Sequence, residues 1–146
     1  MTAKADFTEE EWELLREGPA TAGMIVLLAS GGGSFRETWA LAKTFAEARQ
    51  QHGASQLLDE LVDEGPDVPR FGSAEEAEQE GLDRLRRAVA LLEQKATADD
   101  VESYKRFALE VAERVAAAHQ EEGEAVSGGE REAIAKITAS LNPSPS

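Results

Sequence analysis

The sequence predicts a single all-α domain of about seven helices, and three observations support this expectation. The composition is rich in helix-forming residues and contains only 5% aromatic residues, too few for several β-strands. A Ser or Thr followed three residues later by an acid, the pattern of a helix capping box, recurs along the chain. Apolar residues at helical spacing follow each of these starts. A chain of 146 residues is long enough to bury one hydrophobic core.

Capping boxes mark the expected helix starts. A helix leaves its first backbone N–H groups without acceptors inside the helix, and a side-chain oxygen at the N-cap satisfies one of them. The five pairs are Thr8 with Glu11, Ser34 with Glu37, Ser73 with Glu76, Thr97 with Asp100, and Ser127 with Glu130. A sixth match, Thr44 with Glu47, falls inside a helical pattern, and we interpret it as a chance match.

Two helices are expected in the first part of the chain. Phe7 and Trp12 have the spacing of a hydrophobic staple at the start of the first helix. This helix is expected to end at Gly18-Pro19, because Gly terminates helices and Pro can open the next one. The second helix, over residues 20–29, carries no charge and is therefore expected in the middle of the core.

The helical periodicity predicts five further helices. They span residues 35–52, 56–64, 74–95, 98–120 and 128–141. The apolar face of the first of these is expected to consist of Phe35, Trp39, Ala42, Phe45 and Ala46. The helices over 74–95 and 98–120 are expected to form a long antiparallel pair. The domain is expected to cover residues 1–141, followed by a frayed tail at 142–146.

Composition and charge exclude several classes of protein. The formal net charge of −14 repels phosphate backbones and no basic stripe offsets it, so no nucleic-acid partner is expected. The lack of cysteine excludes disulfides, thiolate metal sites and a cysteine nucleophile, and it fits a reducing compartment. The apolar run at residues 22–29 is shorter than the ~20 residues of a membrane span, and no signal-peptide pattern is visible. These features predict a soluble, cytoplasmic protein.

The sequence contains no recognisable catalytic constellation. His52 and His119 fall in the last turn of an expected helix, where the helix dipole favours a cation. Neither has a Ser, Cys or HExxH partner in the sequence. The glycines at 31–33 lack the Lys and the preceding strand of a phosphate-binding loop, and a connector between helices is expected there. An enzyme that uses carboxylates and a histidine in a helical cleft is the weakest alternative.

One charge cluster has no structural explanation in the sequence. Asp59, Glu60, Asp63 and Glu64 crowd the expected C-terminus of a helix, where acids are unfavourable, and Asp67 follows. Hard divalent cations take oxygen ligands, so Asp59, Asp63 and Asp67 are the candidate metal ligands, although no EF-hand spacing is present. Two other interpretations stay open: a solvated acidic face, and a contact for a protein partner with a basic surface.

Two segments of the chain are similar to each other. SFRETWALAK, from Ser34, and SGGEREAIAK, from Ser127, share an SxxE start and an Ala-Lys pair at the same distance from it. A true duplication and a coincidence both stay open, because Ala and Lys are common in helices.

Two stretches carry a resemblance to a known family. They are FTEEEWELL at residues 7–15, followed by Gly18-Pro19, an apolar helix and a glycine loop, and GEAVSGGEREAIAKITASL at residues 123–141. In these stretches the chain resembles the TerB-like family, named for a tellurite-resistance protein. The resemblance implies a compact all-α domain of two quasi-repeated helical halves, a role in stress response or interaction, and no established catalysis.

The resemblance also bears on metal binding. Family members often carry an Asp-Gly pair in the first glycine loop, with acidic residues proposed to bind metal. Ser30 stands at the position of that Asp, which argues against a metal site in this loop. Glu37 and Glu130 match the family's acidic positions, and helix capping explains both. The expectation is a non-catalytic TerB-like protein that acts through binding, with a divalent-cation binding protein as the alternative.

Overall fold

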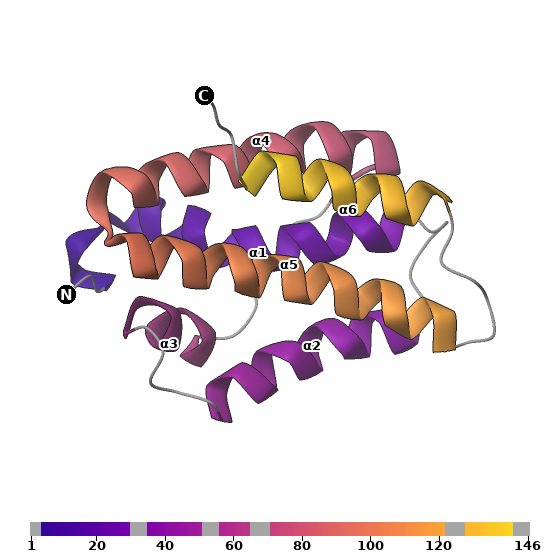
Figure 1. Cartoon of the computed structure of the whole chain (residues 1–146), viewed down its shortest axis with the longest axis horizontal. Helices are drawn as coiled ribbons and strands as arrows, with labels where there is room; N and C mark the ends of the chain where they lie inside the picture. Colours follow the sequence, from indigo (N-terminus) through magenta and orange to yellow (C-terminus); the bar gives the residue numbers. More distant parts are fainter. Residues whose placement is uncertain (1–3, 30–34, 51–55, 65–70, 122–127, 142–146) are drawn as a thin grey trace.

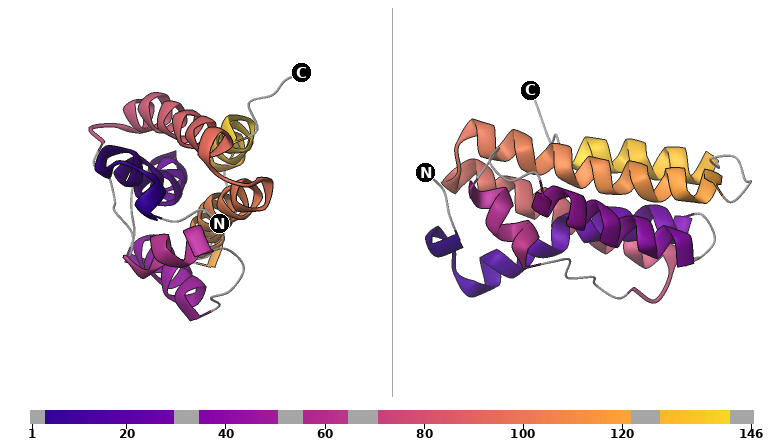
Figure 2. Two further views of the ribbon diagram at one scale, coloured as in Figure 1. Left: turned by 90° about the vertical axis from the view of Figure 1, so that its left-hand side faces the viewer. Right: turned by 90° about the horizontal axis from the view of Figure 1, so that it is seen from below.

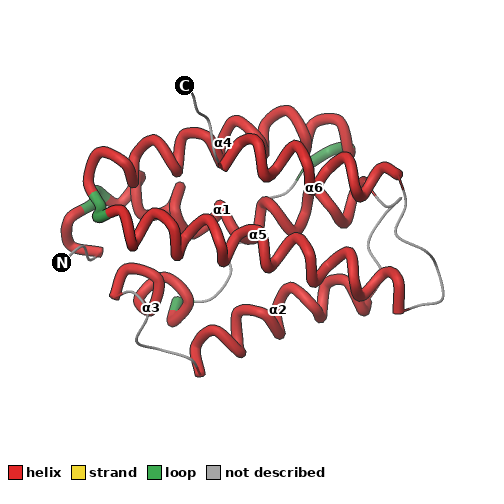
Figure 3. The backbone as a smooth tube through the Cα atoms, viewed as in Figure 1, coloured by secondary structure: helices red, strands yellow, loops and turns green. Residues whose placement is uncertain are grey.

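In the residues that it describes, the computed structural model is a bundle of six α-helices preceded by a short 3-10 helix (Figure 1). The structure describes residues 4–29, 35–50, 56–64, 71–121 and 128–141. Within these ranges every regular element is helical, so the expected all-α class is confirmed (Figure 3). The elements are η1 (Lys4–Asp6), α1 (Glu9–Ala29), α2 (Phe35–Gln50), α3 (Gln56–Asp63), α4 (Ala74–Lys95), α5 (Ala98–Glu121) and α6 (Gly128–Leu141).

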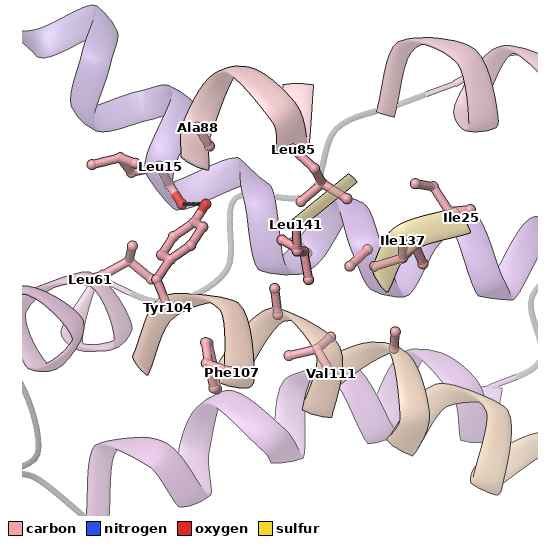
Figure 4. Close-up of a cluster of buried hydrophobic side chains, with 14 of the residues drawn as sticks. Leu15, Ile25, Leu61, Leu85, Ala88, Tyr104, Phe107, Val111, Ile137 and Leu141 are labelled. Atoms are coloured by element: carbon pink, nitrogen blue, oxygen red, sulfur yellow. Dashed lines mark hydrogen bonds between the residues drawn. The ribbon is translucent and has the colours of Figure 1, made fainter. Parts of the chain in front are cut away.

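Helix α1 is continuous through Gly18 and Pro19, so the predicted break at this pair is wrong. Proline has no N–H to donate to the carbonyl four residues earlier, which here belongs to Leu15. The Tyr104 hydroxyl of α5 donates a hydrogen bond to that carbonyl oxygen instead, at 2.8 Å (Figure 4). The carbonyl that proline leaves without a helical partner therefore finds one in another helix.

Gly18 provides the space for this hydrogen bond. A Cβ atom at Gly18 would lie 1.9 Å from the hydroxyl oxygen of Tyr104 and 3.0 Å from its Cζ atom. Tyr104 is almost fully buried, at 1% exposure, so the surrounding core fixes its ring. The Gly-Pro pair that usually ends a helix is thus used here to admit a side chain from α5.

The helices form three layers, with α1 and α5 in the middle (Figure 2). The layer of α4 and α6 covers one side, and the layer of α2 and α3 covers the other. The charge-free stretch of α1 is buried as expected, through Ala20, Thr21, Ala22, Gly23, Ile25, Val26 and Leu27. Helices α4 and α5 run antiparallel, but each packs more extensively on α1 than on the other (Figure 1). The predicted α4–α5 pair is therefore not the main packing unit.

The start of α1 has the predicted capping box and staple. The Glu11 N–H donates to Thr8 Oγ1 at 3.1 Å, and the Thr8 N–H donates to Glu11 Oε1 at 2.9 Å. The rings of Phe7 and Trp12 are in contact, with centroids 6.1 Å apart. These contacts fix the direction in which the chain enters α1.

Two further predicted capping hydrogen bonds are formed. The backbone N–H of Glu76 donates to Ser73 Oγ at 3.1 Å, and that of Asp100 donates to Thr97 Oγ1 at 3.2 Å. The predicted boxes at Ser34 and Ser127 lie outside the described residues. Thr44 lies inside α2, where its hydroxyl donates to the Ala40 carbonyl at 2.7 Å, so the sixth match is confirmed as a chance match.

The predicted core face of α2 is partly wrong. Leu41, Thr44 and Phe45 are buried, whereas Trp39 and Ala42 are exposed. The Phe45 ring packs edge-on against Phe107 of α5, with centroids 5.0 Å apart, and this contact sets which side of α2 faces the core. Since successive helical residues differ by about 100°, Trp39 points away from that side. The side chain of Phe35 lies outside the described part of the chain.

We predict that the Tyr104→Phe variant is less stable than the wild type by about 1–3 kcal/mol, because it leaves the buried Leu15 carbonyl without its donor. Urea denaturation followed by circular dichroism measures this change.

Gly18→Ala should also destabilise the protein, by about 1–3 kcal/mol, because the added methyl group overlaps the Tyr104 hydroxyl.

The double variant Gly18→Ala/Tyr104→Phe supplies the control. Removing the hydroxyl removes the closest overlap, so Gly18→Ala should cost less in the Tyr104→Phe protein than in the wild type. If the losses in unfolding free energy of the two single variants simply add up in the double variant, the proposed contact between Gly18 and Tyr104 is contradicted.

A second prediction concerns alkaline pH. Burial raises the pKa of the Tyr104 hydroxyl well above its ordinary value, and the charge of Glu17 raises it further. Below the unfolded-state pKa of about 10, the free energy of unfolding therefore keeps its full value. It falls as the pH rises above that pKa, because only the unfolded chain then loses the Tyr104 proton. Tyr104 is the only tyrosine in the chain, so tyrosinate absorbance should appear together with loss of the helical signal. A tyrosinate transition in the folded protein near the ordinary pKa would contradict this prediction.

Candidate functional site

The structure divides the predicted acidic cluster between different sides of α3. Asp59 lines a cavity between α2, α3 and α5. Glu60 and Glu64 line a second cavity beside the start of α1. Asp63 is exposed. Adjacent helical residues point about 100° apart, so these acids do not share one face.

The metal prediction for this segment is not tested by the structure. Within the described ranges, no three side chains of Asp, Glu or His gather in a way that could hold a metal ion. Asp67 lies outside those ranges, so the set Asp59, Asp63 and Asp67 stays a prediction.

The second cavity, which we call the N-terminal pocket, is the candidate functional site. Its volume is about 570 Å³, and it lies where the chain enters α1 and leaves α3. It is lined by Ala5, Phe7, Thr8, Glu9, Trp12, Glu13, Arg16, Glu60 and Glu64. The lining therefore combines two aromatic rings with four carboxylates and one guanidinium group.

The two aromatic side chains form an apolar wall of the pocket. Trp12 is buried, at 4% exposure, and Phe7 is half-buried. The indole Nε1–H of Trp12 donates a hydrogen bond to Glu64 Oε2 at 2.6 Å. This hydrogen bond connects the Phe7–Trp12 staple at the start of α1 with the end of α3, and it fixes the positions of both aromatic rings.

Two guanidinium groups bind the C-terminal end of α3. Arg16 donates to the backbone oxygen of Glu64 at 3.4 Å, and its Nε lies 3.9 Å from Glu64 Oε1. Arg49 of α2 donates to the carbonyl oxygen of Val62 at 3.4 Å. These guanidinium groups lie where the helix dipole is negative and offset the unfavourable position of the acids. One acid of the predicted cluster, Glu64, thus has a clear structural role.

A lysine of the protein itself is bound next to the pocket. The Lys95 ammonium lies 5.6 Å from the Phe7 ring centroid and donates to Glu11 Oε1 at 2.7 Å and to the Asp6 carbonyl at 3.3 Å. The hydrogen bonds from Lys95 and from the Thr8 backbone N–H lower the pKa of Glu11. An aromatic ring, a carboxylate and a carbonyl at this end of the molecule therefore already bind one ammonium group.

The cavity between α2, α3 and α5 is smaller, at about 180 Å³. Arg114, on its wall, pairs with Glu47 and with Glu110, the latter at 3.4 Å. The pair with Glu47 connects α5 with α2, whereas the pair with Glu110 lies within α5. We therefore assign this cavity a role in packing.

The exposed side of α2 carries an aromatic side chain that the sequence analysis placed in the core. Trp39 is 57% exposed and, in the described part of the chain, is the one large hydrophobic residue that is exposed. We call Trp39, Ala42, Lys43 and Ala46 the Trp39 face, because their spacing places them on one side of the helix. The sequence of α2 contains two sets of apolar residues. Leu41 and Phe45 belong to the buried core, whereas the residues of the Trp39 face do not.

Several residues that the sequence analysis discusses lie outside the described residues. These include His52, Ser30 and the glycines at 31–33. His119 is in the last turn of α5, as expected from the sequence.

Comparisons with known proteins give no match: no family model matches the chain, and neither does any curated protein or solved structure. None of the helices in the described ranges is sufficiently long and apolar to cross a membrane.

We predict that Glu64→Ala destabilises the protein by about 1–3 kcal/mol, because it removes the acceptor of the Trp12 indole N–H and the anionic partner of Arg16. Urea denaturation measures the change. The matched control is Glu93→Ala, which removes an exposed acid of α4 and should change stability by less than about 0.5 kcal/mol. Equal effects of the two substitutions would contradict the role assigned to Glu64.

Proposed function

We propose that the protein acts without catalysis, by binding a positively charged segment of a partner protein in the N-terminal pocket. The observation that carries this proposal is the lining of a cavity of about 570 Å³ by Phe7 and Trp12 together with Glu9, Glu13, Glu60 and Glu64. Among the lining residues that the structure describes, Arg16 is the one cationic side chain.

The chemistry of this lining fits a lysine or arginine side chain. Such a side chain has an apolar stem and a cationic head. The stem can contact the aromatic wall, and the head can donate charge-assisted hydrogen bonds to the glutamates. The contact between Lys95, Phe7 and Glu11 shows the same combination of groups within the molecule. The net charge of −14 adds a long-range attraction for basic partners.

The TerB-like resemblance supports a binding role and is the ground for placing that role in a stress response of the tellurite type. It also supports the proposal that the protein has no catalytic activity. The divalent-cation alternative is supported by the charge of the segment that contains Asp59, Asp63 and Asp67.

The binding test uses tryptophan fluorescence with oligo-arginine and oligo-lysine peptides as probes. The chain has two tryptophans, so in a Trp39→Phe background all tryptophan emission comes from Trp12 in the pocket wall. We expect the peptides to change this emission in a saturable way. Glu9→Gln/Glu13→Gln should weaken binding several-fold, because each exposed ion pair contributes about 0.2–1 kcal/mol.

The control is Glu80→Gln/Glu93→Gln, which removes the same charge from exposed positions of α4. This pair should leave the affinity close to that of the parent. If both double variants weaken binding equally, the peptides are attracted by net charge alone and the pocket proposal is wrong. Titrations at two salt concentrations separate the two effects further, because long-range attraction is screened beyond about 10 Å at 0.1 M salt.

A further inference from the structure

Helix α2 differs in charge from the rest of the molecule. Among the α-helices that the structure describes, it is the one in which basic residues outnumber acidic ones, three to two, in a chain with a net charge of −14. The exposed side chains of Trp39 and Lys43 lie one turn apart on its outer side. An aromatic ring and an ammonium group are therefore presented together on a basic helix of an acidic protein.

We propose that the basic segment bound in the N-terminal pocket is the Trp39 face of a second copy of this chain. This inference rests on the proposed function and names the partner. The Trp39 ring would contact the wall formed by Phe7 and Trp12, and the Lys43 ammonium would pair with the glutamates at the rim. Ala42 and Ala46 are small, so the rim of the pocket can approach the backbone of α2 closely.

The two surfaces are complementary in charge, and the pocket is large enough for side chains of the Trp39 face. The pocket presents four carboxylates and one guanidinium group, whereas the Trp39 face carries one ammonium group and no acid. A pocket of about 570 Å³ lies within the usual size of ligand sites, about 300–1,000 Å³, and can hold an aromatic side chain together with a lysine stem. A symmetric contact between two Trp39 faces would instead bring Lys43 close to Lys43 of the second copy.

The two surfaces lie on different parts of one molecule. The pocket is at the end where α1 begins and α3 ends, and α2 extends away from it along the lower edge of the bundle in Figure 1. Each copy can thus offer its pocket to one neighbour and its Trp39 face to another. Such a contact is heterologous, and it extends head to tail beyond a dimer.

Sedimentation velocity over a range of concentrations tests this proposal with two variants. The face variant is Trp39→Ala/Lys43→Glu, and the pocket variant is Glu9→Gln/Glu13→Lys. We expect the wild type to form species larger than a dimer as concentration rises, and each variant alone to stay monomeric. An equimolar mixture of the two variants should form a dimer and stop there, because one intact pocket meets one intact face.

Several results would overturn the proposal. One is a wild type that stays monomeric up to millimolar concentration. Another is a pocket variant that still dimerises while the face variant does not, since this pattern indicates a symmetric contact through α2. Binding of oligo-arginine by a wild type that never self-associates would refute the second copy as partner and leave the proposed function intact. Absence of both kinds of binding would refute both proposals.

Folding controls keep the test decisive. Trp39 is exposed, so its removal should leave the urea midpoint close to that of the wild type. If the lysine substitution at Glu13 unfolds the protein, Glu9→Gln/Glu13→Gln replaces it, with an expected several-fold loss of association. A folded Gln variant that associates as strongly as the wild type would also overturn the proposal.

Discussion

The hydrogen bond from the Tyr104 hydroxyl to the Leu15 carbonyl is the interaction on which the arrangement of the bundle depends. It allows α1 to continue through Pro19 as one helix. The first half of α1 carries Trp12, one of the two aromatic rings of the N-terminal pocket, and the second half fills the centre of the core. A single rigid element therefore connects the candidate site with the core, and the site inherits its geometry from the packing of α1 against α5.

Local sequence patterns predicted the parts of the fold that depend on local interactions. The bounds of α4 and α6 agree with the prediction, because apolar periodicity and, at the start of α4, the Ser73 cap act within a few residues. The break at Gly18-Pro19 was predicted by the same local rules and is wrong, because the compensating hydroxyl lies 89 positions beyond Leu15 in the sequence. The position of Trp39 was missed for a similar reason: the contact between Phe45 and Phe107 decides which of two apolar series faces the core.

The candidate site was only partly visible in the sequence. The acids at the end of α3 were recognised as a cluster, but their separation into two cavities depends on how α3 lies against its neighbours. Phe7 and Trp12 were recognised as a staple, and their second role as a pocket wall appears only when Glu64 is brought to the indole. A sequence pattern can identify a residue's local role, whereas a shared cavity requires the tertiary packing of elements far apart in the chain.

The layer formed by α2 and α3 has a consequence for the dynamics of the bundle. Helices α1, α4, α5 and α6 contact one another closely, whereas α2 joins them almost entirely through α5. Elements with fewer contacts to the core open at lower free energy than the whole protein unfolds. Partial opening of this layer would expose Phe45 and Phe107 while the other four helices stay folded. The basic helix α2 and the acids of α3 thus belong to the layer that opens at lower free energy than the rest of the bundle.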